Sequence, residues 1–316
     1  AVNAINRAPA RAAYFAYPSA EMAMTGVREK ASNFMPLNGM WKFNWVKDQT
    51  ERPVDFYQVD FEDQYWVDFP VPGLWELNGY GDPVYKNVGY AWSNQFSPNP
   101  PMIETENNHV GSYRKTFDLP SDWKGQQVYL HVGSATSNLW VWVNGKFVGY
   151  SEDSKMAAEF DITQYLHPGK NLIAMQIYRW CDGSYLEDQD FWRMSGLFRS
   201  VELFTKPEIH LEDVFVKQDF APDFSSATVT FDCKVSGAGT ISVVFDGEEQ
   251  SAEVGEPAEY DSGVVFGKGE ADPDVEEDVQ DVSFTFTVEH PTLWSAEQPN
   301  LYSLALTLYD ASGKEL

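Results

Sequence analysis

Basic residues, cysteines and long apolar runs are scarce in this chain of 316 residues. It has 22 Lys and Arg against 48 Asp and Glu, so its formal net charge is −26. Such an excess of negative charge excludes proteins that bind nucleic-acid backbones or anionic membranes through a basic surface. No run of about 18 apolar residues occurs, which excludes a membrane-spanning helix. We therefore expect neither a nucleic-acid partner nor a membrane partner.

Several well-known catalytic and metal-binding motifs are also missing. The two cysteines, Cys181 and Cys233, are too few and too far apart for a disulfide scaffold. The five histidines are scattered and form no HExxH-type motif. No GxSxG elbow, P-loop or GxGxxG sequence occurs. The sequence thus offers no motif for a zinc, nucleotide or serine-hydrolase site.

The chain does show a strand-like pattern along nearly its whole length. Hydrophobic residues make up 43% and aromatic residues 15%, which is enough for packed cores. Two alternating runs, 139–143 and 146–150, flank Asn144-Gly145, a strong hairpin signal because both turn positions need positive φ. No helical period of useful length occurs, and a short helical turn is expected near 162–166. The pattern predicts an all-β chain.

The pattern breaks near residues 205–209, where Lys206-Pro207 ends one strand. The short apolar runs beyond this break predict a small immunoglobulin-like sandwich of about 100 residues. The acidic stretch 269–281 lacks the sixth-position Gly and the terminal Glu of an EF-hand, so a solvated loop is favoured over a calcium loop. Because the chain stops just after a strand and a turn, we expect this sandwich to be cut before its last strand.

The densest polar and aromatic stretch is 179–196, which holds four carboxylates, two Trp, a Tyr and two Arg. Long polar loops on a β scaffold tend to carry function. Aromatic rings beside carboxylate and amide groups suit sugars, whose C–H faces pack on rings and whose hydroxyls bond to polar groups. The residue types alone are equally typical of a structural loop held by Arg–Asp pairs.

The run 182–199 resembles the hallmark of glycoside hydrolase family 2, specifically of its large bacterial β-galactosidases. Other segments resemble that family in the same order, from about residue 5 to the end of the chain. These segments are Asn6-Arg7, 37–43, 71–75, 79–85, 105–107, 147–150 with Asp153-Ser154, 159–161 and 293–302.

This resemblance implies an all-β fold in which a jelly-roll, galactose-binding-like β-sandwich is followed by an immunoglobulin-like β-sandwich. The corresponding boundaries are an N-terminal extended segment at 1–30, the jelly roll at 31–206 and the second sandwich at 207–316. It also implies a parent enzyme, a retaining β-galactosidase that hydrolyses terminal non-reducing β-D-galactose residues with two glutamates of a (β/α)₈ barrel. Those glutamates are absent from these 316 residues. We therefore expect no catalytic residue here, and no activity of the chain alone.

Four residues match functional positions of the family. Asn107 and Asp190 match residues that contact galactose, and Asp190 also matches a sodium ligand whose other ligands come from the barrel. Asp182 and Glu152 match positions that bind magnesium, so Mg²⁺ or Ca²⁺ is a candidate there, against a simple hydrogen-bonded pair of loop carboxylates. The implied cofactors of the parent enzyme are therefore Na⁺ and Mg²⁺.

Other side chains of these segments are expected to be structural. We expect Glu187 and Asp188 to accept backbone N–H groups or to pair with arginines, and Cys181 to be a buried thiol. Trp180 and Trp192 are expected to pack the loop onto the sandwich. His109 follows one residue more than the family pattern has here, and it is a candidate for the pocket rim. Four further tryptophans lie in strand-like runs and are expected to be core or sheet-face residues: Trp41, Trp75, Trp140 and Trp142.

Three roles compete. The chain is the non-catalytic N-terminal part of a β-galactosidase, a free-standing carbohydrate-binding module, or a purely structural support; a parent β-glucuronidase or β-mannosidase is a further alternative. The expected partners are a galactoside substrate and the chain's own catalytic barrel, with a homo-oligomer left open. An acidic chain without disulfides suits the cytoplasm or the periplasm of a bacterium.

Overall fold

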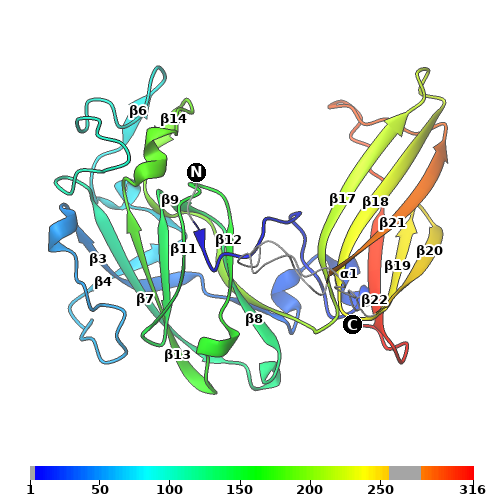
Figure 1. Ribbon diagram of the computed structural model, residues 1–316, viewed down its shortest axis with the longest axis horizontal. Helices are drawn as coiled ribbons and strands as arrows, with labels where there is room; N and C mark the ends of the chain where they lie inside the picture. Colours follow the sequence, from blue (N-terminus) through cyan, green and yellow to red (C-terminus); the bar gives the residue numbers. More distant parts are fainter. Residues whose placement is uncertain (1–3, 256–278) are drawn as a thin grey trace, which may run out of the picture. The chain divides into compact units, whose positions relative to one another are not determined.

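The computed structural model describes residues 4–255 and 279–316. The chain divides into two compact units. Unit 1 comprises Ala1–Pro9 and Ser32–Thr205, and unit 2 comprises Ala10–Ala31 and Lys206–Leu316. Both are built almost entirely of β-strands, as the pattern predicts (Figure 1). In the described ranges, no helix is long and apolar enough to cross a membrane.

Unit 1 contains a seven-stranded and a four-stranded sheet. The seven-stranded sheet runs in the order β1 (Ala4–Ile5), β11 (Lys146–Ser151), β10 (Leu139–Val143), β13 (Gly169–Tyr178), β7 (Val110–Leu119), β3 (Gly39–Val46), β4 (Val67–Val71). The four-stranded sheet runs in the order β12 (Ala158–Asp161), β8 (Gln127–Val132), β16 (Val201–Lys206), β2 (Phe34–Pro36). The predicted hairpin is present, because Val143 pairs with Lys146 across Asn144 (φ 50°) and Gly145 (φ 80°).

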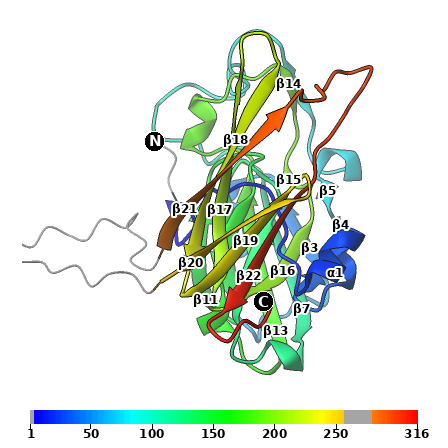
Figure 2. The same ribbon diagram turned by 90° about the vertical axis from the view of Figure 1, so that its right-hand side faces the viewer.

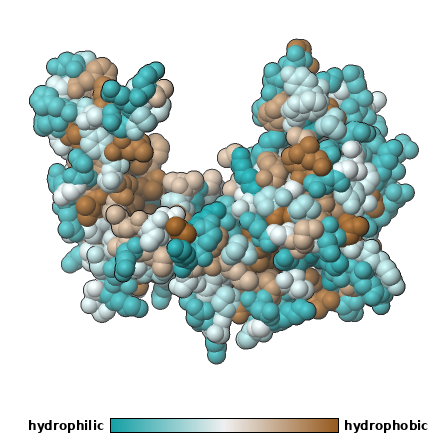
Figure 3. All heavy atoms as spheres, turned by 180° about the vertical axis from the view of Figure 1, so that it is seen from behind, coloured by the Kyte–Doolittle hydropathy of each residue, from teal (hydrophilic) through white to brown (hydrophobic). Residues whose placement is uncertain are grey.

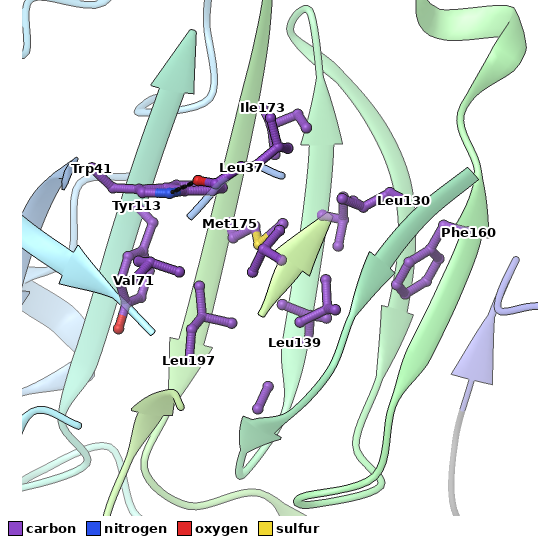
Figure 4. Packing of buried hydrophobic residues seen from close by; sticks show 14 of the residues in the cluster. Leu37, Trp41, Val71, Tyr113, Leu130, Leu139, Phe160, Ile173, Met175 and Leu197 are labelled. Atoms are coloured by element: carbon purple, nitrogen blue, oxygen red, sulfur yellow. Dashed lines mark hydrogen bonds between the residues drawn. The ribbon is translucent and has the colours of Figure 1, made fainter. Parts of the chain in front are cut away.

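The core of unit 1 is built from one face of the seven-stranded sheet and one face of the four-stranded sheet. Successive side chains of a strand point to opposite faces, so every second residue of β10 and β13 turns inward. Val141, Ile173 and Met175 on these strands are 0% exposed. Leu130 of β8 and Phe160 of β12 belong to the same cluster (Figure 4). The outer face of β10 and β13 is left for other contacts.

The polar stretch at 179–196 lies in short elements outside the two main sheets of unit 1. The 3₁₀ turn η6 (Asp182–Tyr185) begins it, and β14 (Phe191–Arg193) pairs with β6 (Val84–Lys86). A further small sheet has the order β5 (Gly73–Leu74), β15 (Gly196–Leu197), β9 (Ala135–Thr136). The remaining 3₁₀ turns of unit 1 are η2 (Gln49–Glu51), η3 (Glu76–Asn78), η4 (Ser121–Trp123) and η5 (Thr163–Tyr165), and η5 confirms the turn predicted near 162–166.

Unit 2 is a sandwich of two three-stranded sheets (Figure 2). One sheet has the order β17 (His210–Phe220), β18 (Ser226–Ser236), β21 (Val279–Glu289), and the other β20 (Glu248–Val254), β19 (Gly239–Phe245), β22 (Leu304–Asp310). Its core is aromatic: the rings of Phe231, Phe245 and Phe286 lie 5.2–5.8 Å apart. Of the acidic stretch 269–281, residues 269–278 lie outside the described residues. The last residues lie antiparallel to β22, where Leu316 N–H donates to Leu308 O at 3.0 Å.

The first thirty residues are shared between the two units. Residues 4–5 form β1 along β11 in unit 1, whereas residues 10–31 belong to unit 2. There Ala12 N–H donates to Asp213 Oδ1 at 2.8 Å. The segment contains helix α1 (Ala20–Thr25), which Ser19 caps by accepting from Met22 N–H, followed by the 3₁₀ turn η1 (Arg28–Lys30). On the face seen in Figure 3, polar side chains cover most of the surface and apolar patches lie between them.

Candidate functional site

A first cluster of candidate ligands forms where β11 ends and η6 begins. Glu152 follows β11 directly, and Cys181 and Asp182 open η6. Ligand atoms of these three residues all lie within 4.8 Å of one another. The turn is fixed because Ser184 N–H donates to Cys181 O at 2.9 Å and Cys181 N–H donates to Ser184 Oγ at 3.1 Å. The structure therefore brings together Asp182 and Glu152, which lie 30 residues apart in sequence.

The possible metal ligands of this cluster suit a hard cation better than a soft one. Burial, together with the charge of Glu152, raises the pKa of the Cys181 thiol to about 11. The thiol is thus protonated at neutral pH, as expected for a buried, inert cysteine. Tyr150 Oη donates to Glu152 Oε2 at 2.8 Å, which fixes the carboxylate. The oxygen atoms of the cluster are those of the Glu152 and Asp182 carboxylates. Oxygen ligands of this kind suit Mg²⁺ or Ca²⁺.

Two adjacent asparagines have different environments. Asn108 is buried, and its side chain accepts from Trp180 N–H at 3.0 Å and donates to Trp180 O at 3.1 Å. Asn107 is exposed and has a left-handed φ of 57°, and its own N–H donates to the Asp48 carboxylate. Asn107 therefore presents its amide to solvent, whereas the amide of Asn108 is bonded to the backbone of Trp180.

His109 holds the side chain of Asn107. Its Nδ1 lies 3.1 Å from Arg179 Nη1, and its Nε2 lies 3.3 Å from Asn107 Oδ1. Because a guanidinium only donates, Nδ1 is the acceptor and the ring proton sits on Nε2, which donates to Asn107. Burial, then the positive charges of Arg179 and Lys47, lower the pKa of His109 to about 4, so the ring is neutral at pH 7. The amide oxygen of Asn107 is engaged, and its NH₂ group remains as a donor. The expectation that His109 lies at a pocket rim is wrong, because the residue is buried, with 5% of its surface exposed.

Asp190 lies at the start of β14, with its carboxylate in solvent. The Tyr85 hydroxyl on β6 donates to this carboxylate, and the hydrogen bond and the negative charge raise the pKa of Tyr85. Trp192 and Tyr85 are cross-strand partners with ring centroids 5.2 Å apart, and they are 54% and 50% exposed. The expectation that Trp192 packs onto the sandwich is therefore wrong, because the two-stranded sheet of β14 and β6 leaves that face of Trp192 uncovered. Trp180 is buried, as expected.

The loop before β6 adjoins both predicted sugar contacts. A Cβ on Gly81 (φ 73°) would lie 2.9 Å from His109 Nδ1, so glycine permits the close approach of this loop to the histidine. Arg179 Nη2 donates to Asp82 O at 2.7 Å, and three residues later Tyr85 on β6 donates to Asp190. Within the described residues no hydrogen bond joins Asn107 to Asp190 directly.

Sequence reasoning missed the roles of Arg179 and Tyr85. Tyr85 lies in a segment that carries the family resemblance and Arg179 in the polar stretch 179–196, but no spacing rule links them to the residues they hold. Of the expected ion pairs, Glu187 and Arg193 lie 3.5 Å apart, and Arg199 instead donates to Lys155 O at 2.9 Å.

The chain is thus an all-β protein of two sandwich units, with an exposed carboxylate, an oriented amide and an aromatic pair of the kind that recognises sugars. A family model described as "Glycosyl hydrolases family 2, sugar binding domain" matches residues 34–207, and "Glycosyl hydrolases family 2" matches residues 209–316. The chain belongs to glycosyl hydrolase family 2.

Its relatives include β-galactosidases. It is 38% identical over 312 residues to the β-galactosidase of Priestia megaterium, and this match covers 98% of the chain and 29% of the relative. The β-galactosidase of Halalkalibacterium halodurans is also 38% identical, with 99% of the chain and 29% of the relative covered. A crystal structure of Bacteroides uniformis β-glucuronidase is similar with a TM-score of 0.65 at 19% identity, covering 90% of this chain and 31% of that one. At that identity the similarity shows the fold alone.

Proposed function

We propose that this chain is the non-catalytic part of a retaining β-galactosidase and that it lends Asn107 and Asp190 to the galactose site. The observation that carries the proposal is the state of these two side chains. Each presents a polar group to solvent, and each is held by a specific neighbour, His109 for Asn107 and Tyr85 for Asp190. The identity to β-galactosidases along nearly the whole chain supports galactose as the sugar.

The two groups would bind a sugar in complementary ways. The carboxylate of Asp190 accepts hydrogen bonds from sugar hydroxyls, and bonds to an ionised acceptor are the stronger kind. The NH₂ of Asn107 donates to a hydroxyl or ring oxygen. Because His109 already occupies the amide oxygen, the amide is preoriented and less rotamer entropy is lost on binding.

Two cation sites are part of the proposal. Asp190 would supply one ligand to a sodium ion, with the other ligands coming from the catalytic barrel. Asp182 and Glu152 would hold Mg²⁺ or Ca²⁺, which would tie the end of β11 to η6. Catalysis is assigned to the part of the relatives' length that this chain does not match, since a retaining mechanism needs a pair of carboxylates about 5–5.5 Å apart flanking the bond.

The test is Asp190→Asn in the longer β-galactosidase that the proposal implies. Loss of the charged acceptor should lower kcat/KM by about tenfold or more, because a hydrogen bond to a charged group contributes about 1.5–3 kcal/mol. The rate increase on replacing choline chloride by sodium chloride should disappear, while the melting temperature stays unchanged. The matched control is Asp188→Asn, an exposed carboxylate two residues away that should leave the kinetics unaltered. Unchanged kinetics in Asp190→Asn would refute the assignment.

A carbohydrate-binding module is the second candidate, because every residue of this site lies in unit 1. Under the main proposal, much of the pocket is supplied by the barrel, so calorimetry on this chain should detect galactose binding only in the millimolar range or not at all. Micromolar binding would favour the module. Hydrolysis of a β-glucuronide or a β-mannoside in place of a β-galactoside would change the parent enzyme's class.

A further inference from the structure

A large cavity lies on the outer face of the seven-stranded sheet of unit 1. Its volume is about 580 Å³, within the range of about 300–1,000 Å³ that is usual for small-molecule sites. The floor is formed by side chains of β10, β11 and β13 that point away from the core, including Trp140, Trp142 and Gln176. Two loops, containing residues 49–56 and 101–105, form its walls. Neither Asn107 nor Asp190 lines it.

One part of the lining is a connected set of polar groups. Tyr178 Oη donates to Gln176 Oε1 at 2.9 Å, and Gln176 Nε2 donates to Ser112 Oγ at 2.9 Å. Arg52 lies over the Tyr178 ring at 6.0 Å and donates to Gln49 O at 2.9 Å. Burial, opposed by Arg52, raises the pKa of Tyr178, so its hydroxyl stays protonated. The amide and guanidinium groups are thus held in place before any ligand arrives.

The other part of the lining is aromatic and equally fixed. The Trp142 ring stacks on Tyr57 with centroids 5.2 Å apart and an interplanar angle of 9°, and on Trp140 at 6.2 Å and 17°. Trp140 packs against Tyr150 at 4.6 Å. Both indoles remain only partly buried, so some of their surface is left to the cavity.

We propose that this cavity binds a short neutral saccharide, independently of the site around Asp190. Its lining contains one cation, Arg52, and one carboxylate, Asp182, and is otherwise neutral, which disfavours strongly charged ligands. Amide and hydroxyl groups beside rigid indoles match a ligand whose hydroxyls need donors and acceptors and whose C–H surfaces need apolar contact.

The experiment uses this chain and titrates it with lactose and with cellobiose, following tryptophan fluorescence and the indole N–H signals in NMR spectra. We expect saturable binding in the millimolar range that shifts the signals of Trp140 and Trp142. Arg52→Ala and Gln176→Ala should each weaken binding by about tenfold, the effect of losing one good hydrogen bond. The matched control is Gln126→Ala, an exposed glutamine outside the cavity lining, which should leave affinity unchanged.

The outcomes separate this site from the proposed galactose site. Binding that persists in Asp190→Asn but weakens in the cavity variants supports the cavity. Binding that is lost in Asp190→Asn and persists in Arg52→Ala overturns the cavity and leaves the proposed function standing. No binding of either sugar to the folded wild-type chain also overturns it. If Gln176→Ala does not fold, Arg52→Ala and Arg52→Lys, both at a loop position, decide the matter.

Discussion

Unit 1 and unit 2 both bury charged or polar side chains within a β-sandwich, but the hydrogen-bond partners of these side chains differ. In unit 1 the buried groups lead outward: Arg179 bonds to His109, and His109 bonds to the exposed Asn107. In unit 2 His210 and Lys206 both bond to Glu212, near the start of β17. The described bonds of unit 1 thus extend to an exposed amide, whereas those of unit 2 join charged groups at one end of a strand.

The loops of the two units differ in the same sense. Unit 1 carries the long segments that form η6, the two-stranded sheet of β6 and β14, and the walls of the cavity. The described core of unit 2 is built mainly of phenylalanines and valines between two small sheets. Long loops on a rigid sheet are where binding groups are commonly placed. The comparison therefore supports the proposal that the sugar contacts lie in unit 1.

The larger expected effect is a loss of stability of unit 1 as the pH falls. His109 has a pKa of about 4 in the folded chain, against 6.5 for the ordinary side chain, so the unfolded state binds more protons between these values. Unit 1 should therefore lose stability as the pH falls from about 6.5 to about 4, by at most about 3 kcal/mol at about 1.4 kcal/mol per pKa unit. Thermal unfolding followed across this range measures the loss.

The control for that prediction is His109→Gln, which keeps a neutral side chain with a donor. It should flatten the dependence on pH between about 6.5 and about 4. An unchanged slope in this variant would show that other groups cause the loss.

A smaller effect is expected in unit 2, at lower pH. Burial opposes the ionised form of Glu212, but the hydrogen bond and charge of His210 and the charge of Lys206 outweigh it and lower the pKa to about 2. This contribution is complete above about 4.5, the ordinary value, and is lost as the pH falls towards about 2. Because Glu212 is 21% exposed, solvent screening should keep the effect below that of His109.

The measurement is the acid unfolding of unit 2, compared with that of Glu212→Gln. The variant should start less stable at neutral pH and should lose less stability below about pH 4.5. If both units lose stability in one shared pH window, the different pKa values of His109 and Glu212 are not what governs their acid response.

Much of the fold could be predicted from local sequence. Alternation along 139–143, the Asn144-Gly145 turn and the short turn near 162–166 depend on backbone preferences of neighbouring residues, and the structure contains all three. The buried state of Trp41 was expected from its strand-like context, and the structure confirms it. The assignment of Asp182 and Glu152 came from resemblance, since no spacing rule joins residues on different elements.

The arrangement of the site could not be predicted in this way. Trp192 was expected to pack its loop onto the sandwich, yet it lies in a sheet of only two strands that leaves it half exposed. The tautomer of His109 depends on Arg179, which lies 70 residues further along the chain. These facts follow from which strands become neighbours, and strand order depends on the free energy of the whole sheet.

The sequence by itself determined the β-rich class, the hairpin, the two-sandwich organisation and the family, because these depend on local periodicity and on ordered motifs. Only the tertiary structure decided that Asn107 is exposed while Asn108 is bonded to Trp180, that Tyr85 holds Asp190, and that a 580 Å³ cavity opens on the outer sheet face. Each of these depends on burial and on contacts between distant segments, which residue types and spacing do not encode.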